Sequence, residues 1–266
     1  MKIAIIGCGT TGNQIIPKLR EHELLIIDRD LVEEKNLSRQ TQFSSDDVGR
    51  PKAQVLGEKF KINYKVLDLD CTNVNILNFD LVIDCTDNLI TRFLINDYCK
   101  KENIPWIYTG VVGDRGRVLG FTGDYCFRCL FKEVKGLDTC TSTGVDLEVA
   151  GQVGKIAVEE AERILAGKKP RGLWAGEWIA VKKDKDCLAC NGTYEYLDKK
   201  EDIVKFCGSS RYQFKGNFDF ENIKKRLGGS GEYFVYKDFS IFKDRVLVKA
   251  DSEKEAKKKF NEVIGA

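Results

Sequence analysis

The sequence contains very little histidine and proline. His22 is the single histidine among 266 residues, and four residues are proline. Histidine is the side chain that most often moves protons near neutral pH, and it is a frequent metal ligand. We therefore expect neither a catalytic histidine nor a histidine-ligated metal. His22 follows the first predicted helix and is expected on the surface. The scarcity of proline and the lack of low-complexity tracts argue against long disordered segments.

An excess of one charge and long apolar runs are also missing. The formal net charge is +2, which gives no overall field that would attract a nucleic acid or a membrane surface. No apolar run approaches the roughly 20 residues of a membrane-spanning helix. Ten cysteines occur without a secretory signal. We therefore expect a reducing, cytoplasmic location, with metal or thiol chemistry rather than a disulfide scaffold.

The first thirty residues carry the strongest local pattern. A short apolar run over 2–6 precedes a glycine-rich turn, a helix is expected over 13–20, and a second apolar run over 24–27 ends on Asp28. Strand, glycine turn, helix, strand and acid, in this order, are the fingerprint of a nucleotide-binding βαβ unit. The sequence therefore predicts a mononucleotide or dinucleotide site here. The alternative is a glycine turn between two core strands that binds no ligand.

The glycines of this turn have separate expected roles. Gly7 permits the tight turn, Gly9 lets the backbone approach a phosphate group, and Gly12 lets the helix pack closely on the strand. The N-terminus of the helix offers unpaired N–H groups to an anion. Asp28 lies sixteen residues after Gly12, where its carboxylate is placed to accept hydrogen bonds from a ribose.

Alternating strand and helix patterns continue beyond this unit. Pro51 is expected to begin a helix, because the first helical position needs no N–H. Further strands are predicted over 64–67, 80–85, 105–112, 117–122 and 173–181, and further helices over 52–61, 89–101 and 146–166. This alternation predicts a Rossmann-like α/β fold with a mostly parallel sheet, helices on both faces and some antiparallel strands later in the chain.

From residue 201 the chain is rich in lysine and aromatic residues. Short strands are predicted near 212–214 and over 232–236, 240–242 and 246–249, and a helix over 220–227. A last helix is expected after Ser252, which would form a capping box with Glu255. We therefore expect a first domain over residues 1–192 and a small α+β extension of unknown role over 201–266.

Two C-x-x-C pairs stand far apart in the sequence, Cys126 with Cys129 and Cys187 with Cys190. Each pair presents two thiolates at knuckle spacing, and four thiolates complete a tetrahedral structural zinc site. The alternative is two redox-active dithiols, each placed at a helix N-terminus after a strand, and neither pair is clearly placed that way. A closed zinc site would hold the ends of this segment together and would leave no open position for catalysis.

Cys140 stands apart in a polar, glycine-rich segment before the helix predicted over 146–166. The N-terminus of that helix would stabilise a thiolate, so Cys140 is a candidate nucleophile. An ordinary loop cysteine is the alternative. Cys207 is a lesser candidate for a reactive thiol. The remaining four cysteines are expected to be packing residues: Cys8, Cys71, Cys85 and Cys99.

Polar side chains follow several predicted strands, where the loops of an open α/β sheet line a ligand crevice. Arg39 and Lys52 can neutralise phosphate charge. Asp87 can hold a magnesium ion, which prefers one or two carboxylates together with phosphate oxygens. Asn36 and Gln40 lie in the same polar loop as Arg39. Each of these residues taken alone is more often a surface residue, but their shared location favours a phosphate site.

Seven short motifs follow one another in order over residues 1–192. They are Gly7-x-Gly9-x-x-Gly12, Asp28-x-Asp30, Asn36-Leu37-Ser38-Arg39-Gln40, Gly49-Arg50-Pro51-Lys52, Asp84-Cys85-Thr86-Asp87-Asn88, Cys126-x-x-Cys129 and Cys187-x-x-Cys190. Together they resemble the ThiF/MoeB/HesA superfamily, the prokaryotic relatives of ubiquitin-activating enzymes. The resemblance implies an enzyme that uses ATP and Mg²⁺ to adenylate the C-terminal glycine of a ubiquitin-like β-grasp sulfur carrier ending in Gly-Gly.

The resemblance also implies roles for individual residues. Asp28 would hold the ribose, Asn36, Arg39 and Lys52 would meet the phosphates, and Asp87 would hold Mg²⁺ with Asn88 beside it. Cys140 matches a T-C-x-x-x-G-V pattern whose cysteine, in some members, forms an acyl-disulfide or thioester-like link with the carrier. A sulfurtransferase or cysteine desulfurase would then be a further partner. Other motif residues assigned to the nucleotide site are Gly7, Gly9, Thr10, Gly12, Asp30 and Gln40.

Two features depart from the superfamily pattern. Thr10 stands where many members have a third glycine. Members usually carry a helical segment before the first strand, which supplies an arginine to the partner subunit's site. This chain begins directly on the strand, so the shared arginine is missing and the shared-site dimer of the superfamily is not expected, although a homodimer without that arginine stays open.

Three other interpretations stay open. A relative that adenylates transfer RNA would typically lack the C-x-x-C pairs. A nicotinamide-dependent oxidoreductase would have no use for the loops of Arg39 and Lys52. A non-catalytic binding module held together by zinc would not bind ATP. Within the favoured interpretation, thiamin synthesis, molybdopterin synthesis, transfer-RNA thiolation and protein conjugation are alternative pathways.

Overall fold

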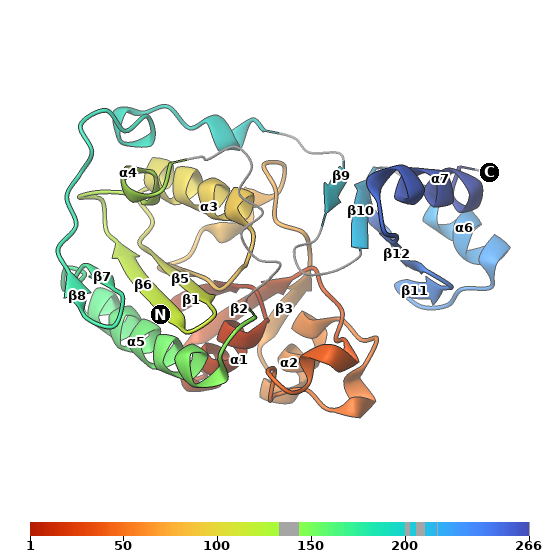
Figure 1. The fold of residues 1–266 in the computed structure, drawn as a ribbon, viewed down its shortest axis with the longest axis horizontal. Coiled ribbons are helices and arrows are strands. Elements are labelled where there is room, and N and C mark those ends of the chain that lie inside the picture. Colours follow the sequence, from red (N-terminus) through yellow and green to blue (C-terminus); the bar gives the residue numbers. More distant parts are fainter. Residues whose placement is uncertain (133–143, 200–202, 206–210, 217, 266) are drawn as a thin grey trace. The chain divides into compact units, whose positions relative to one another are not determined.

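The chain forms two compact units, Met1–Lys199 and Lys200–Ala266. The structure is a computed structural model that describes residues 1–132, 144–199, 203–205, 211–216 and 218–265 (Figure 1). None of the helices in these ranges combines the length and the hydrophobicity needed to cross a bilayer. Each unit has its own sheet and its own core, so the two are described separately.

The described part of the first unit is built on an eight-stranded sheet with the order β3-β2-β1-β4-β5-β6-β7-β8. The strands β1 to β5 run parallel and β5 to β8 run antiparallel. This confirms the predicted mostly parallel sheet with antiparallel strands later in the chain. The strand bounds are Lys2–Ile6, Glu23–Asp28, Asn63–Val66, Leu81–Asp84, Trp106–Val112, Arg115–Phe121, Leu173–Trp174 and Trp178–Ile179 for β1 to β8.

Helices cover both faces of this sheet, because β1 and β2 are apolar on both sides. Ile3 and Ile5 face a core that also contains residues of α1 (Thr10–Ile15), α2 (Lys52–Phe60) and α5 (Leu147–Leu165). Ala4 and Ile6 point to the other face, where α3 (Leu89–Glu102) packs. Figure 1 shows α3 and α5 on opposite sides of the sheet. Successive strand residues point to opposite faces, so one apolar run fills both cores.

Three local expectations were wrong. The first helix begins at Thr10 with Gly9 as its N-cap, and it ends in a 3₁₀ turn over Ile16–Lys18. The strand predicted over 173–181 is the short hairpin of β7 and β8, which turns at Gly176 with a φ of 90°. His22 is mostly buried, and its Nε2 atom lies 2.9 Å from Glu162 of α5. The contact of His22 joins residues that are 140 positions apart, so the local sequence pattern does not contain it.

The second unit has an antiparallel sheet with the order β11-β12-β13-β10-β9. Its strands are β9 Ile203–Lys205, β10 Arg211–Lys215, β11 Tyr233–Tyr236, β12 Phe239–Phe242 and β13 Arg245–Lys249. The helices α6 (Phe220–Leu227) and α7 (Glu253–Val263) share one apolar cluster with it. Ser252 caps α7 as expected, but Glu255 accepts from the Asp251 N–H rather than from Ser252. The small α+β fold of this unit is as predicted.

Candidate nucleotide site and tetracysteine cluster

The predicted phosphate-site motifs of the first half meet at one edge of the sheet. The strands β1, β2 and β4 are adjacent and parallel, with Ile6 paired to both Ile27 and Asp84. Because the carboxyl ends of parallel strands share an edge, the loops that follow these strands come together. The glycine turn, the segment Asp28–Asp30 and the segment Asp84–Asn88 are therefore neighbours, although more than 70 residues separate the first from the last.

Each glycine of the turn has a distinct geometric environment. Gly7 has a φ of 98°, and a Cβ atom there would lie 2.7 Å from the backbone oxygen of Cys85. A Cβ on Gly12 would lie 2.1 Å from the Gly7 oxygen, so the helix approaches the turn as closely as its backbone allows. A Cβ on Gly9 would meet no atom within 4 Å. The turn is thus closed on its inner side, whereas Gly9 has free space at the position of a side chain.

The carboxylate of Asp28 is bound to the backbone of this turn. It accepts hydrogen bonds from the N–H of Cys8 at 2.5 Å and from the N–H of Asp30 at 2.6 Å. Burial, followed by the negative charge of Asp30, raises the pKa of Asp28 to about 6. A carboxylate oxygen has more than one lone pair, so a ribose hydroxyl still finds an acceptor here. Asp28 therefore both holds the glycine turn and remains a candidate ribose ligand.

Lys52 lies buried between two carboxylates. Its Nζ atom is 3.1 Å from Asp30, and only 6% of its side chain is exposed. Burial by itself would lower the pKa of Lys52, but the negative charges of Asp30 and then Asp28 raise it above its ordinary value. The ammonium group is therefore charged and held in place, ready to neutralise an anion that enters the site.

Asp87 projects from the turn between β4 and α3. The residue is exposed, and its carboxyl group interacts with the charges of Asp30, Arg29, Arg92 and Lys52. Loss of water around the carboxyl group, followed by the negative charge of Asp30, raises the pKa of Asp87. Two carboxylates whose charges interact have the composition of a magnesium site completed by phosphate oxygens.

Asn88 has a structural role that its place in the motif did not indicate. It is the N-cap of α3, and its side-chain oxygen accepts hydrogen bonds from the N–H groups of Ile90 and Thr91 at 2.9 and 3.4 Å. An asparagine at this position satisfies backbone donors that would otherwise lack partners. Asn88 thus fixes the end of the turn that carries Asp87.

The loop with Asn36, Arg39 and Gln40 lies beside the glycine turn. Arg39 donates to the Asn36 side chain at 3.5 Å. Gln40 is buried, and its Oε1 atom has no hydrogen-bond partner within the described ranges. Asn13 connects this loop to the turn, because it donates to the Cys8 oxygen and accepts from the Gln42 N–H, both at 2.9 Å. No direct contact joins Arg39 to Lys52 or Asp87 among the interactions described.

Several residues of this site carry no signal in the sequence. Asp84 is completely buried and pairs with Arg92 at 3.3 Å, and Arg29 pairs with Asp68 at 2.9 Å. Asn13 belongs to the same group. Their roles depend on contacts between distant segments, so the spacing of residue types could not identify them. Asp84 belongs to one of the sequence motifs, but the motif itself assigns it no role.

The four cysteines of the C-x-x-C pairs form one cluster. Their Sγ atoms all lie within 4.8 Å of one another, and the distances from Cys126 to Cys129 and Cys187 are 3.9 and 3.5 Å. Cys129 and Cys190 are 3.6 Å apart. Four sulfurs around a tetrahedral zinc ion, each at about 2.3 Å, would be separated by about 3.8 Å. The donors and their spacing therefore fit zinc, and none of the four forms a disulfide.

The cluster is attached to the end of α3 by a buried ion pair. Arg128, inside the first C-x-x-C pair, pairs with Asp97 of α3 at 3.0 Å, and Asp97 is completely buried. Asp97 also accepts from the N–H of Tyr196 at 3.2 Å, beyond the second pair. The segments that carry the two halves of the cluster thus bind the same carboxylate.

The other cysteines fall into two groups. Cys8 and Cys99 are fully buried, and burial raises the pKa of both thiols, so they are packing residues as expected. Cys71 and Cys85 are half-buried. Cys140 and Cys207 lie outside the described residues, so their predicted reactivity stays a prediction.

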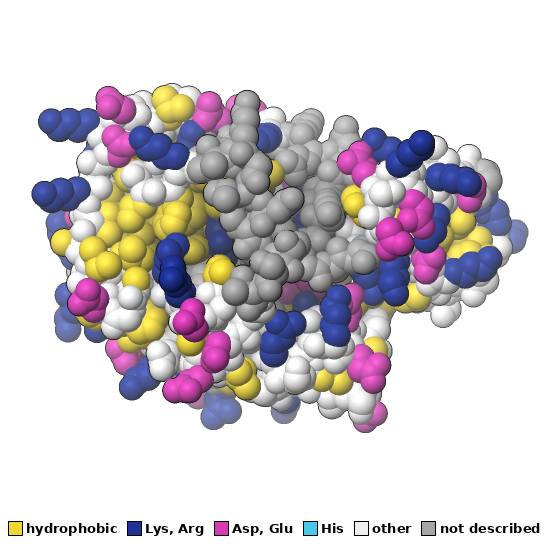
Figure 2. All heavy atoms as spheres, viewed as in Figure 1, with side chains coloured by type: hydrophobic (Ala, Val, Ile, Leu, Met, Phe, Trp, Pro, Cys, Tyr) yellow, Lys and Arg dark blue, Asp and Glu magenta, His cyan; other side chains and the backbone are white. Residues whose placement is uncertain are grey.

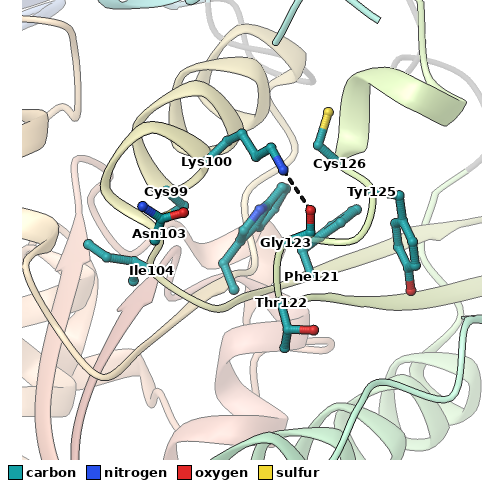
Figure 3. A pocket seen from close by; sticks show the side chains of 10 residues that line it. Cys99, Lys100, Asn103, Ile104, Phe121, Thr122, Gly123, Tyr125 and Cys126 are labelled. Atoms are coloured by element: carbon teal, nitrogen blue, oxygen red, sulfur yellow. Dashed lines mark hydrogen bonds between the residues drawn. The ribbon is translucent and has the colours of Figure 1, made fainter. Parts of the chain in front are cut away.

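A small pocket lies at the opposite edge of the sheet (Figure 3). Trp106 begins β5 there, and Lys100 donates a hydrogen bond to the Gly123 oxygen at 2.6 Å across its mouth. The amino ends of parallel strands lie at this edge, away from the loops of Asp87 and Lys52. The pocket is therefore separate from the candidate nucleotide site.

Comparison with known proteins gives a consistent result. The model of the ThiF family matches residues 1–178. The SAMP-activating enzyme E1 of Haloferax volcanii is 34% identical over 180 residues, covering 62% of this chain and 67% of that protein. The sulfur carrier protein ThiS adenylyltransferase of Escherichia coli is 30% identical over 213 residues, covering 72% of this chain and 85% of that protein. Longer relatives exist, and the chain spans 61% of one of them.

Solved structures support the fold. E. coli MccB in its crystal structure with ATP matches with a TM-score of 0.62 and 22% identity, over 71% of this chain and 65% of that chain. The family match covers more than half of the sequence and includes the glycine turn, Lys52, Asp87 and the first C-x-x-C pair. The chain belongs to the ThiF family.

Proposed function

We propose that this protein uses ATP to adenylate the C-terminal carboxylate of a ubiquitin-like sulfur carrier that ends in Gly-Gly. The observation that carries the proposal is the cluster of Lys52, Asp30 and Asp87 beside an open glycine turn in a member of the ThiF family. Relatives named for activating SAMP and ThiS support a carrier of this class. The first unit would perform the adenylation.

The residues present fit ATP. The open space above Gly9 would admit phosphate, the buried Gln40 Oε1 atom offers a free acceptor, and Lys52 presents a fixed positive charge. Asp28 would hold the ribose, and Asn36 and Arg39 would approach the outer phosphates from the neighbouring loop. A fixed cation needs no reorganisation as charge develops on the departing pyrophosphate, which lowers the barrier.

Asp87, whose charge interacts with that of Asp30, would hold Mg²⁺, and the bound ion would add positive charge beside the phosphates. In the reaction, an oxygen of the carrier's terminal carboxylate forms a bond to the α-phosphorus of ATP. The bond from that phosphorus to the bridging oxygen breaks, and pyrophosphate leaves. The chain's own contribution is to position the two substrates and to neutralise charge through Lys52 and Arg39.

The tetracysteine cluster would hold one structural zinc ion. All four donors are thiols and no open coordination position remains, so the ion would stabilise the fold rather than take part in catalysis. The sequence between the two pairs forms α5 and the β7–β8 hairpin. Zinc would therefore close a long segment that begins and ends at α3.

An apolar surface on the first unit suits a protein partner. Figure 2 shows hydrophobic side chains gathered over β5 and β6. Tyr108 and Leu119 are buried beneath this face, whereas Leu173, which pairs with Leu119, and Phe131, which packs against Tyr108, are partly exposed. Exposed apolar patches of this kind commonly mark protein-binding sites.

Cys140 would act after adenylation. A thiolate is a good acceptor for an activated acyl group and contributes nothing to the neutralisation of a triphosphate. A separate sulfurtransferase or cysteine desulfurase would then supply sulfur.

Exchange of radiolabelled pyrophosphate into ATP, with candidate carriers ending in Gly-Gly, tests the proposal. We expect exchange that depends on the carrier and on Mg²⁺ and is lost when the last glycine of the carrier is deleted. Asp87→Ala, Lys52→Ala and Arg39→Ala should each reduce the rate by roughly 10²–10³-fold. Near-normal exchange in all three variants would show that the site is wrong. ATP consumption on transfer RNA without any carrier would favour the transfer-RNA alternative.

A further inference from the structure

Arg92 of α3 makes a set of contacts that the proposed chemistry does not yet explain. Its side chain is mostly buried, and its Nε atom lies 3.3 Å from the completely buried carboxylate of Asp84. The guanidinium group donates to the backbone oxygens of Thr86 and Thr109, the latter at 3.3 Å. It also stacks over the Tyr108 ring at 4.9 Å. One side chain thus connects the end of β4, the following turn and β5.

The turn held in this way is the one that carries Asp87. Asp84 Oδ1 accepts from the N–H and the hydroxyl group of Thr86, at 2.9 and 2.7 Å. Arg92 binds the Thr86 oxygen, on the other side of the same residue. Asn88 is fixed by its cap on α3. Both neighbours of Asp87 are therefore anchored, whereas Asp87 itself stays exposed.

A metal-binding carboxylate has to be correctly directed before the cation arrives, since reorganisation after binding reduces affinity. Arg92 contributes to this condition, because it holds the backbone oxygen of Thr86, the residue directly before Asp87.

We propose that Arg92 is a positioning residue for the divalent cation, acting through the turn that directs Asp87. The proposal rests on the proposed function, because it assumes that Asp87 holds a cation together with ATP. It assigns Arg92 no contact with substrate. Loss of Arg92 should then weaken the binding of the cation in the nucleotide complex much more than it weakens the binding of nucleotide alone.

The test compares two buried arginines of the same unit. Arg128 is a matched control, because it pairs with buried Asp97 at 3.0 Å and stacks over Tyr196 at 5.4 Å, but lies at the tetracysteine cluster. Arg92→Met and Arg128→Met each remove one buried arginine–aspartate pair. Arg92→Lys keeps the charge but loses the planar group that reaches three acceptors at once.

The primary measurement is Mn²⁺ binding, followed by electron paramagnetic resonance, with a non-hydrolysable ATP analogue bound to the protein. Binding of the analogue without metal is measured by calorimetry. For Arg92→Met we expect Mn²⁺ affinity to fall by roughly 10–100-fold, the range seen when supports of metal ligands are removed. Analogue affinity without metal should change by less than about threefold on the same reasoning, and Arg92→Lys should be intermediate. Arg128→Met should leave Mn²⁺ affinity within about twofold of the unaltered chain and lower only stability.

The outcomes distinguish a failure of the positioning role of Arg92 from a failure of the proposed function. One outcome refutes the positioning role: the unaltered chain binds Mn²⁺ in the presence of the analogue, and Arg92→Met binds Mn²⁺ as tightly as the unaltered chain or as Arg128→Met. The proposed function is not affected by that outcome. If the unaltered chain does not bind Mn²⁺ with the analogue, the proposed function fails and Arg92 has no cation to position. Should Arg92→Met fail to fold, Arg92→Lys decides by the same measurement.

Discussion

Asn13 accepts a hydrogen bond from the backbone N–H of Gln42 at 2.9 Å, although 29 residues separate the two in the chain. The same side chain donates to the Cys8 oxygen at 2.9 Å, and Asn13 is almost completely buried. One amide group thus joins the glycine turn to the loop that carries Arg39. The position of this loop relative to the phosphate site therefore depends on a residue with no expected chemical role.

Replacement of Asn13 should affect both stability and nucleotide binding. Asn13→Leu keeps the side-chain size but leaves the Cys8 oxygen and the Gln42 N–H without partners, so we expect a loss of about 1–3 kcal/mol in unfolding free energy. ATP affinity should also fall, because the Arg39 loop is no longer held. Urea unfolding and calorimetry measure the two effects. Asn96→Leu is the control, because Asn96 is equally buried but binds Phe127 near the tetracysteine cluster. The control variant should lower stability and leave ATP affinity unchanged. Equal ATP affinity in both variants would contradict the linking role.

Lys52→Met should abolish most of the adenylation activity. The substitution removes the buried cation that lies 3.1 Å from Asp30 and leaves two carboxylates facing each other. We expect pyrophosphate exchange to fall by roughly 10²–10³-fold, the usual effect of losing one preorganised charge. Lys65→Met, on the exposed side of the edge strand β3, is the control and should be neutral. A loss of activity of less than tenfold in Lys52→Met would mean that the phosphates bind elsewhere.

Zinc should be present at one ion per chain and should matter for stability rather than for nucleotide binding. Cys187→Ser removes one of four thiolates, and we expect zinc loss and a clearly lower melting temperature. ATP affinity should stay close to that of the unaltered chain. Mass spectrometry of the native protein and thermal unfolding check this. Cys99 is buried and lies outside the cluster, so the control variant Cys99→Ser should retain one zinc ion per chain. A metal-free native protein with both C-x-x-C pairs oxidised under reducing purification would refute the zinc assignment.

Stability should depend on pH through Asp28. Its pKa is about 6 in the folded protein and 3.8 ordinarily, so the folded state binds the proton more tightly than the unfolded chain. Stability therefore falls as pH rises from about 4 to about 6, and the full penalty, about 3 kcal/mol, is present above pH 6. Asp28→Asn should flatten this slope in urea unfolding at a series of pH values. Asp124 has an exposed carboxylate, so the control variant Asp124→Asn should not change the dependence of stability on pH. An unchanged slope in Asp28→Asn would exclude Asp28 as its source.

Cys140→Ala should leave pyrophosphate exchange largely intact and stop a thiol-sensitive covalent complex with the carrier, or the delivery of sulfur to it. The reason is that acyl transfer to a thiolate follows adenylation and does not contribute to it. Mass analysis of enzyme, carrier and ATP under non-reducing conditions gives the answer. If the variant still forms the adduct and still thiolates its carrier, the chemistry belongs to Cys207 or to a separate sulfurtransferase.

Local patterns predicted much of the molecule. The apolar run over Ile3–Ile6 with Gly7 and Gly12 behind it specified the first βαβ unit, because strand burial and a tight turn leave direct traces in residue type. The C-x-x-C pairs that begin at Cys126 and Cys187 indicated one cluster for a similar reason, because two such pairs are typical of a site in which four thiolates bind one metal ion. The bounds of α3, α5 and α6 also came out within two residues of the prediction.

Long-range packing decided the rest. The sequence by itself determined that Lys52 and Asp87 follow strands and bear suitable charges, but not that Asp30 would hold Lys52 or that Arg92 would anchor the turn of Asp87. The first contact joins residues that are 22 positions apart, and the second joins helix α3 to strand β5. They arise only when β1, β2, β4 and β5 align in one sheet, because parallel pairing brings their carboxyl ends together and burial then forces each polar group to find a partner.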